Sequence, residues 1–148
     1  SWYFYDLDRK RAVIDFSVSV HFMKTVLEQL HLGERPLTLM GFSQGGYASL
    51  AVADQVSQID HVIGLGCQFR PDRIGNEVQG LLRCRVDAVH GELDDVVDFD
   101  LAKKYFAELQ GHGVRGEFVS VPGVGHRLDD RILSEALRLY QAKSKGGA

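Results

Sequence analysis

A serine flanked by glycines is the feature of this 148-residue sequence that most directly suggests chemistry. Ser43 lies in the stretch Gly-Phe-Ser-Gln-Gly-Gly at positions 41–46, after an apolar run at 36–40 and before small, helix-compatible residues at 47–53. A serine hydroxyl becomes an effective nucleophile when it is exposed beside a base and near donors that stabilise an oxyanion. A glycine-lined turn between a strand and a helix provides that setting. We therefore predict that Ser43 is a nucleophile, and a serine that only caps the following helix is the alternative.

A histidine and an aspartate farther along the chain could complete a catalytic group with this serine. Asp94 follows an apolar run at 84–89, and His126 follows another at 118–121. A histidine can take the serine proton and pass it to a leaving group, while a carboxylate fixes the tautomer of the imidazole and stabilises its protonated form. We predict that Asp94 is the acid and that His126 is the base.

Several neighbouring side chains compete for the same roles. Asp95 and Asp98 are further candidates for the acid, and the His-Gly pair at 90–91 favours Asp94 by its spacing. His90 ends a predicted strand but precedes the acid, so we expect it to shape the turn. A metal hydrolase that uses His90, Asp94 and His126 is a weaker alternative, because no two histidines have the spacing of metal ligands on a helix or strand.

The elements that must position these residues alternate between strands and helices. Apolar or alternating segments predict strands at 36–40, 61–65, 84–89 and 118–121, and amphipathic segments lie between them. This alternation indicates one mostly parallel sheet with helices on both faces. Because the carboxyl ends of parallel strands share one edge of a sheet, the three candidate catalytic residues would meet there.

Three elements carry finer expectations. A stripe that ends at Leu30 predicts a first helix of about 18 residues from near Phe16. In the strand at 84–89, apolar residues alternate with charged ones, which predicts a partly solvated face and a place nearer the sheet edge than the strand at 36–40. A final helix should begin at Asp129 or Asp130. Its expected inward residues are Leu133, Ala136, Leu137 and Tyr140.

Length and composition are those of one globular domain. The chain is 45% hydrophobic and 25% charged, so we expect a single domain over residues 1–142 with a flexible tail at 143–148. A net charge of -3 argues against nucleic acid as a partner. No apolar run approaches the roughly 20 residues that cross a bilayer, and the two cysteines are interpreted as buried thiols. We expect a protein without a membrane span in a reducing, cytoplasmic location.

The sequence resembles the phospholipase/carboxylesterase family of α/β-hydrolases, which includes the acyl-protein thioesterases. The resemblance rests on three motifs in order: Gly-Phe-Ser-Gln-Gly-Gly at 41–46, His-Gly-x-x-Asp-x-Val-Val at 90–97, and Gly-x-Gly-His at 123–126. Ser-Trp-Tyr at 1–3 is similar to a Trp-bearing segment ahead of the first long helix in that family. The resemblance spans nearly the whole chain.

This resemblance implies an α/β-hydrolase fold and assigns a role to each candidate. It makes Ser43 the nucleophile, Asp94 the acid and His126 the base. It also implies that the backbone amide of Gln44 is an oxyanion donor, and it implies no metal or organic cofactor.

Two differences from the family pattern carry expectations of their own. Asp95 stands where the family commonly has proline, which should loosen the loop that carries the acid. Family members have additional amino-terminal strands, and the loop after one of them supplies a second oxyanion amide. We therefore expect an amino-terminally truncated fold whose strand at 36–40 is exposed along the sheet edge, and either a complementary amino-terminal segment or self-association as a homo-oligomer to cover it.

The expected reaction is hydrolysis of a carboxylic ester or thioester through an acyl-enzyme on Ser43, and a non-catalytic hydrolase-like scaffold is the alternative function. Short-chain esters are the first choice of substrate, followed by lysophospholipids or acylated proteins. The loop from Cys67 to Gly80 is expected to set specificity. The expected apolar lining of the substrate pocket consists of Phe42, Phe69, Val96, Val97 and Leu128.

Overall fold

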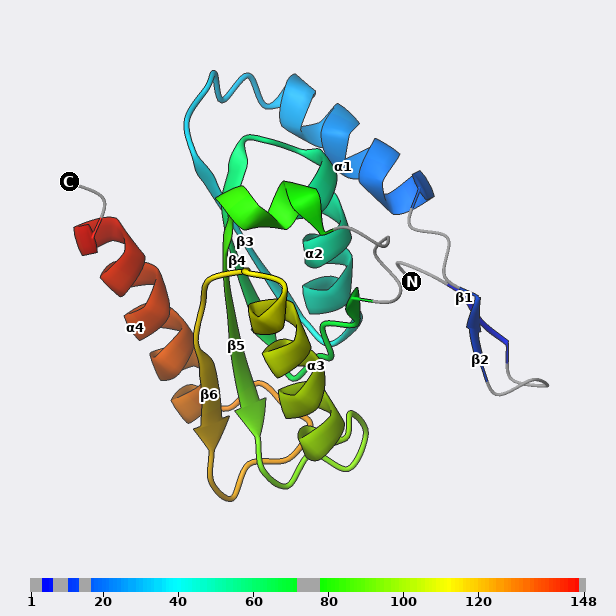
Figure 1. Cartoon of the computed structure of the whole chain (residues 1–148), viewed down its shortest axis with the longest axis vertical. Coiled ribbons are helices and arrows are strands. Elements are labelled where there is room, and N and C mark those ends of the chain that lie inside the picture. Colours follow the sequence, from blue (N-terminus) through cyan, green and yellow to red (C-terminus); the bar gives the residue numbers. More distant parts are fainter. Residues whose placement is uncertain (1–3, 7–10, 14–16, 72–77, 147–148) are drawn as a thin grey trace.

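Four parallel strands form the central sheet (Figure 1). The computed structural model describes residues 4–6, 11–13, 17–71 and 78–146. Across the sheet the strands lie in the order β3 (Leu37–Phe42), β4 (Ile59–Leu65), β5 (Arg85–Gly91) and β6 (Phe118–Val121). Each neighbouring pair is parallel, so the predicted parallel sheet is confirmed.

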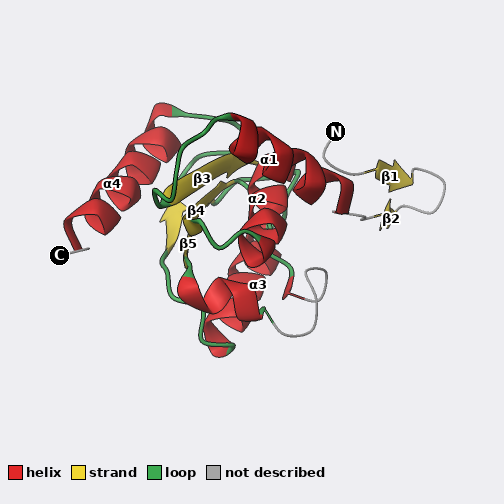
Figure 2. Cartoon of the chain, turned by 90° about the horizontal axis from the view of Figure 1, so that it is seen from above, coloured by secondary structure: helices red, strands yellow, loops and turns green. Residues whose placement is uncertain are grey.

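Helices cover both faces of this sheet, as the alternation of elements predicts (Figure 2). α1 (Ser17–Gln29), α2 (Gln44–Gln55) and α3 (Phe99–Gly111) lie on one side, and α4 (Asp130–Gly146) lies on the other. A short 3-10 helix, η2 (Gln79–Arg83), precedes β5. None of the described helices is long and apolar enough to span a membrane.

The amino-terminal elements differ in detail from the expectation. β1 (Phe4–Asp6) and β2 (Arg11–Val13) form an antiparallel hairpin away from the main sheet, and the Trp-bearing residues 1–3 lie outside the described residues. α1 has 13 residues, so it is shorter than its apolar stripe suggests. Leu30 lies beyond its end and is exposed, and Phe16 lies outside the described residues.

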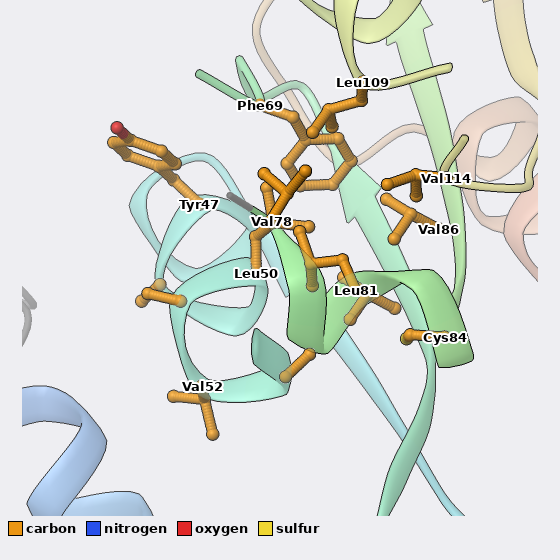
Figure 3. Close-up of a cluster of buried hydrophobic side chains, with 14 of the residues drawn as sticks. Tyr47, Leu50, Val52, Phe69, Val78, Leu81, Cys84, Val86, Leu109 and Val114 are labelled. Atoms are coloured by element: carbon orange, nitrogen blue, oxygen red, sulfur yellow. The ribbon is translucent and has the colours of Figure 1, made fainter. Parts of the chain in front are cut away.

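Two hydrophobic clusters hold the layers together, one on each face of the sheet. The larger includes Leu50 of α2, Leu109 of α3 and the loop residue Phe69, which pack together as Figure 3 shows. The smaller lies between the sheet and α4. Burial of apolar surface at about 25 cal/mol per Å² is what fixes these helices on the sheet. The smaller cluster consists of Ile63, Leu65, Val89, Val121, Val124, Ile132, Ala136 and Leu139.

Both cysteines are buried free thiols, as the sequence predicts. Burial raises the pKa of Cys84 to about 12, and burial also raises the pKa of Cys67. Both thiols therefore stay protonated and pack as small apolar groups.

The prediction that the strand at 84–89 lies nearer the sheet edge than β3 is wrong. β5 pairs with both β4 and β6, whereas within the described residues β3 pairs with β4 alone. The charge alternation misled because Asp87 is fully buried instead of solvated: its Oδ2 atom accepts from His61 Nε2 at 2.8 Å and from Arg85 Nε at 2.6 Å. Burial raises the pKa of Asp87, but the hydrogen bonds from His61 and Arg85 outweigh burial and hold that pKa below its ordinary value.

The inward face of α4 also differs from the expected one. Of the four residues predicted to face the core, Ala136 is buried, while Leu133, Leu137 and Tyr140 are exposed. Ile132 and Leu139 contact the sheet in their place. The packed stripe is therefore shifted by one position around the helix.

The carboxyl-terminal boundary lies farther along the chain than expected. α4 continues through Gly146 instead of ending near residue 142. Lys143 Nζ donates to Asp60 Oδ2 at 2.5 Å, which connects this part of the helix to the start of β4. Residues 143–146 therefore belong to α4 and not to a separate tail.

Candidate active site

Ser43 is the residue between β3 and α2, and its backbone is strained. Its φ of 52° and ψ of -118° lie outside the regions that L-residues favour. A hydrogen bond from Ser43 N to Leu65 O, at 2.8 Å, ties this turn to the end of β4. Strain of this kind persists only where the surrounding structure holds it, and it is common at functional sites.

Glycines allow the turn to be this tight. A Cβ atom on Gly41 would lie 2.3 Å from the carbonyl carbon of Gly45, and one on Gly46 would lie 2.6 Å from Cys67 Sγ. A side chain at position 41 would therefore push β3 and α2 apart. The glycine-lined turn predicted from the sequence therefore depends on the missing side chains at Gly41 and Gly46.

The side chains of Ser43, His126 and Asp94 form a continuous hydrogen-bonded chain. His126 Nε2 lies 3.1 Å from Ser43 Oγ, and His126 Nδ1 lies 2.8 Å from Asp94 Oδ2. An ionised carboxylate only accepts hydrogen bonds, so Nδ1 carries the hydrogen and Nε2 is left to accept from the serine hydroxyl. This is the arrangement that a general base beside a nucleophile requires.

The structure distinguishes among the three candidate acids. Asp94 is buried, and its Oδ1 atom accepts from the backbone N–H groups of Val96 at 3.0 Å and Val97 at 2.8 Å. Asp95 is exposed to solvent. Asp98 caps α3, because its Oδ1 atom accepts from the backbone N–H of Leu101 at 2.8 Å. Asp94 is therefore the carboxylate that the fold brings to His126.

The Asp94–His126 pair is shielded, whereas the serine end is open. The side chain of Asp94 is 1% exposed and that of His126 is 14% exposed, while Ser43 is half-buried. The ring of Phe42 packs against the imidazole of His126, with ring centroids 4.8 Å apart. Gly66 lies beside the pair, since a Cβ atom there would come within 3.5 Å of both Asp94 Oδ2 and His126 Nδ1. The hydrogen bond between Asp94 and His126 is thus shielded from water, and the hydroxyl of Ser43 stays accessible.

Gln44 is the first residue of α2. The N–H groups of the first turn of a helix point beyond its N-terminus and carry the positive end of the helix dipole. The position directly after Ser43 suits the oxyanion role expected for the Gln44 amide.

The residues expected to line a substrate pocket have different environments. Phe42 lies beside His126, and Val97 is half-buried in the loop that holds Asp94. Val96 and Leu128 are exposed. Phe69 is 1% exposed and belongs to the larger hydrophobic cluster, so it packs in the core instead of contacting a substrate. Part of the loop expected to set specificity, residues 72–77, lies outside the described residues.

Hydrogen bonds hold the side chains of Ser43, His126 and Asp94 together. Among the residues that the structure describes, no group of three or more His, Cys, Asp or Glu side chains has the geometry to hold a metal ion.

Sequence reasoning missed two contributions to this site. Gly66 was not considered, although a glycine directly after the strand beside the serine-bearing strand is a usable signal. His90 was assigned to a turn, yet its Nε2 atom lies 3.2 Å from Asp94 Oδ2. The spacing of four residues between His90 and Asp94 could have indicated this contact.

A strained serine turn at the carboxyl edge of a parallel sheet, joined to a histidine and an acid from later strand ends, defines an α/β-hydrolase. Residues 16–142 match the family model for phospholipase/carboxylesterase. The chain therefore belongs to the phospholipase/carboxylesterase family, as its three motifs predict.

Individual relatives agree with this assignment. Over 131 residues the chain is 28% identical to acyl-protein thioesterase 1 homolog 1 of Dictyostelium discoideum. The match covers 80% of this chain and 54% of that protein. The chain thus spans about half the length of the curated relative that it matches.

Solved structures share the fold. Acyl-protein thioesterase 2 of Zea mays superposes with a TM-score of 0.76 at 18% identity, over 96% of this chain and 71% of that one. SOBER1 of Arabidopsis thaliana superposes with a TM-score of 0.74 at 21% identity, over 96% and 73%. At such identities the likeness speaks for the fold alone.

Proposed function

We propose that this chain carries the catalytic machinery of a serine hydrolase that cleaves carboxylic esters or thioesters. The observation that carries the proposal is the unbroken hydrogen-bonded chain from Ser43 Oγ through His126 to Asp94. A bare Ser-x-Gly turn would support many roles, but a serine beside a tautomer-fixed imidazole is arranged for nucleophilic attack.

The proposed reaction proceeds through an acyl-enzyme. Ser43 Oγ attacks the carbonyl carbon as its proton passes to His126 Nε2, and the backbone N–H of Gln44 donates to the oxyanion. Collapse of this intermediate breaks the bond to the alcohol or thiol, which takes the proton from His126. Water then attacks the acyl-enzyme with His126 as base, and the carboxylic acid and free serine are regenerated. Asp94 stabilises the imidazolium in both halves.

Short-chain carboxylic esters are the substrates that we propose first. The serine end of the site is open, and Phe42 and Val97 are the apolar side chains that we propose to contact an acyl group. Lysophospholipids and acylated proteins come next, the latter because the curated relative is named an acyl-protein thioesterase. A reducing, cytoplasmic location is proposed on the two buried free thiols.

Covalent labelling of Ser43 tests the activity. We expect a fluorophosphonate probe to label Ser43, Ser43→Ala to abolish labelling, and His126→Ala to slow it strongly. Activity should survive a strong chelator. A folded chain that does not react would contradict the proposal and favour a hydrolase-like scaffold without catalysis.

We also propose that a complementary amino-terminal segment pairs with the edge of β3 and completes the oxyanion site. Within the described residues β3 has one strand partner, and Met40 on β3 is 48% exposed. An apolar groove runs beside this edge, and the chain covers only 54% of its curated relative. Unpaired edges of this kind tend to recruit a strand. The groove is lined by Met23, Leu39, Met40, Gly41, Gly45, Ala48, Ser49 and Val52.

Intact mass and sizing of native material test this pairing. A longer polypeptide or a bound segment is the expected result. A stable, active monomer of 148 residues would refute the proposal, and a dimer of that chain would show self-association across the edge in its place.

A further inference from the structure

A second imidazole contacts the candidate acid. His90, near the end of β5, is fully buried, and its Nε2 atom lies 2.9 Å from Val97 O and 3.2 Å from Asp94 Oδ2. His126 Nδ1 approaches the same Oδ2 atom at 2.8 Å. One carboxylate oxygen is therefore shared between two histidines.

The partners of His90 determine where its hydrogen lies. A backbone carbonyl only accepts hydrogen bonds, so His90 Nε2 carries the hydrogen that Val97 O receives. His90 Nδ1 is buried and has no hydrogen-bond partner among the described residues, so a second proton there would leave a buried donor unsatisfied. The hydrogen that His90 donates to the loop therefore lies on Nε2.

Aromatic rings hold His90 in this orientation. The ring of Phe118, at the start of β6, stacks on the imidazole at a centroid distance of 6.2 Å and an interplanar angle of 16°. The ring of Phe99, at the start of α3, meets it edge-on at 5.9 Å and 69°. Residues of three separate elements, β5, β6 and α3, therefore set the orientation of the ring.

His90 connects the loop that carries Asp94 to β5. The carboxylate accepts three hydrogen bonds, from the backbone amides of Val96 and Val97 on Oδ1 and from His126 on Oδ2. His90 Nε2 donates to the carbonyl oxygen of Val97 and lies 3.2 Å from Asp94 Oδ2. The side chain of His90 thus holds the loop by a hydrogen bond and lies against the carboxylate.

We propose that His90 is a positioning residue that holds the Asp94 carboxylate in the rotamer that faces His126. Without the N–H of His90, the loop loses the hydrogen bond at Val97 O, and Asp94 Oδ2 loses the polar neighbour beside its bond to His126. The catalytic consequence rests on the proposed function, whereas the effect on the Asp94–His126 hydrogen bond does not.

Three substitutions separate the donor from the shape of the side chain. His90→Phe fills the slot between Phe99 and Phe118 with a ring but has no donor. His90→Gln can place an amide N–H near the position of Nε2, and His90→Leu is a second, smaller variant without a donor. Thermal unfolding and the amide spectrum establish that each variant is folded.

The first readout is independent of activity. In protein with ¹⁵N-labelled histidine, we expect the proton on His126 Nδ1 to give a downfield, exchange-protected resonance. That resonance should move or broaden in His90→Phe and His90→Leu and persist in His90→Gln. An unchanged resonance in the folded donor-less variants would overturn the proposal, as would unfolding of both, because His90 would then support the fold as a whole.

The second readout is kinetic. We expect His90→Phe to lower kcat and the rate of Ser43 labelling about tenfold, the effect of losing one buried hydrogen bond, with little change in KM. His90→Gln should recover most of that loss. In an Asp94→Ala background, His90→Phe should cause no further loss, because His90 acts through Asp94.

An additive loss in the Asp94→Ala background would contradict the positioning role. If the wild-type chain itself resists labelling at Ser43, the proposed function fails. The resonance of His126 then still decides whether His90 positions Asp94.

Discussion

Asp94 and Asp95 are adjacent in the sequence, yet the fold gives them opposite surroundings. Asp94 is buried and accepts three hydrogen bonds, whereas Asp95 is exposed. We expect Asp94→Asn to lower kcat about 10³–10⁴-fold toward a short-chain nitrophenyl ester, because an amide favours the wrong tautomer of His126. Asp95→Asn should leave kcat nearly unchanged. Equal losses in the two variants would contradict the choice of acid.

Two glycines provide a matched test of the serine turn. A Cβ atom on Gly41 would meet the backbone of Gly45 at 2.3 Å, whereas one on Gly111 would meet nothing within 4 Å. We expect Gly41→Ala to cost about 2–4 kcal/mol of unfolding free energy, because the backbones of β3 and α2 are packed too tightly to move apart without loss of contacts. Gly111→Ala should be neutral or slightly stabilising, since it restricts the unfolded chain. Urea titrations measure both, and similar stabilities would contradict the tight turn.

At the scale of the elements, β5 contains a buried charge network instead of a wet face. The pKa of Asp87 lies below its ordinary value of 3.8, although burial opposes this, because His61 and Arg85 donate to its carboxylate. Between that ordinary value and the lower folded one, the unfolded chain binds more protons than the folded chain. The free energy of unfolding should therefore fall as pH drops through this window.

Asp87→Asn tests the network. We expect it to weaken this pH dependence and to cost about 3–5 kcal/mol near neutral pH, because it removes one partner of a buried pair. Urea titrations between pH 3 and pH 7, about the range in which carboxylates titrate, measure both effects. Exposed Asp95→Asn is the control. An unaltered pH dependence in Asp87→Asn would show that other groups cause it.

α4 offers a second matched pair. Leu139 is fully buried against the sheet, and Leu137 is 53% exposed. We expect Leu139→Ala to cost about 2–5 kcal/mol of unfolding free energy and Leu137→Ala to cost about 0.5 kcal/mol or less. If Leu137→Ala lost more unfolding free energy than Leu139→Ala, the face of α4 predicted from the sequence would be the packed one.

The elements show where sequence reasoning succeeds and where it stops. The meeting of Ser43, Asp94 and His126 could be predicted because each follows a recognisable strand, and the carboxyl ends of parallel strands lie at one edge of the sheet. The burial of Asp87 could not be predicted, because its partner His61 lies on another strand. The same alternation of charged and apolar residues occurs in a strand with a solvated face and in a strand with a buried charge pair. The apolar residues of α4 cover a wide arc of the helix surface. Which of them face the sheet depends on the rotation of the helix about its axis, and the sequence alone does not determine that rotation.

At the scale of the whole molecule, the serine and the histidine come from opposite edges of the sheet. Neighbouring strands lie about 4.8 Å apart, so β3 and β6 are separated by roughly 14 Å. Nevertheless His126 Nε2 lies 3.1 Å from Ser43 Oγ. The segment after β6 therefore reaches back over the ends of β5 and β4.

The contact between His126 and Ser43 therefore depends on all four strands, β3 to β6, staying paired. On heating, we expect labelling of Ser43 to decline before helical circular dichroism does, because fraying at the β6 edge withdraws His126 while the serine turn stays intact. Coincident curves would contradict this. If labelling does decline first, reactivity of Ser43 reports whether the whole sheet is assembled. A chain whose β6 edge has detached could keep its helical circular dichroism and still not react.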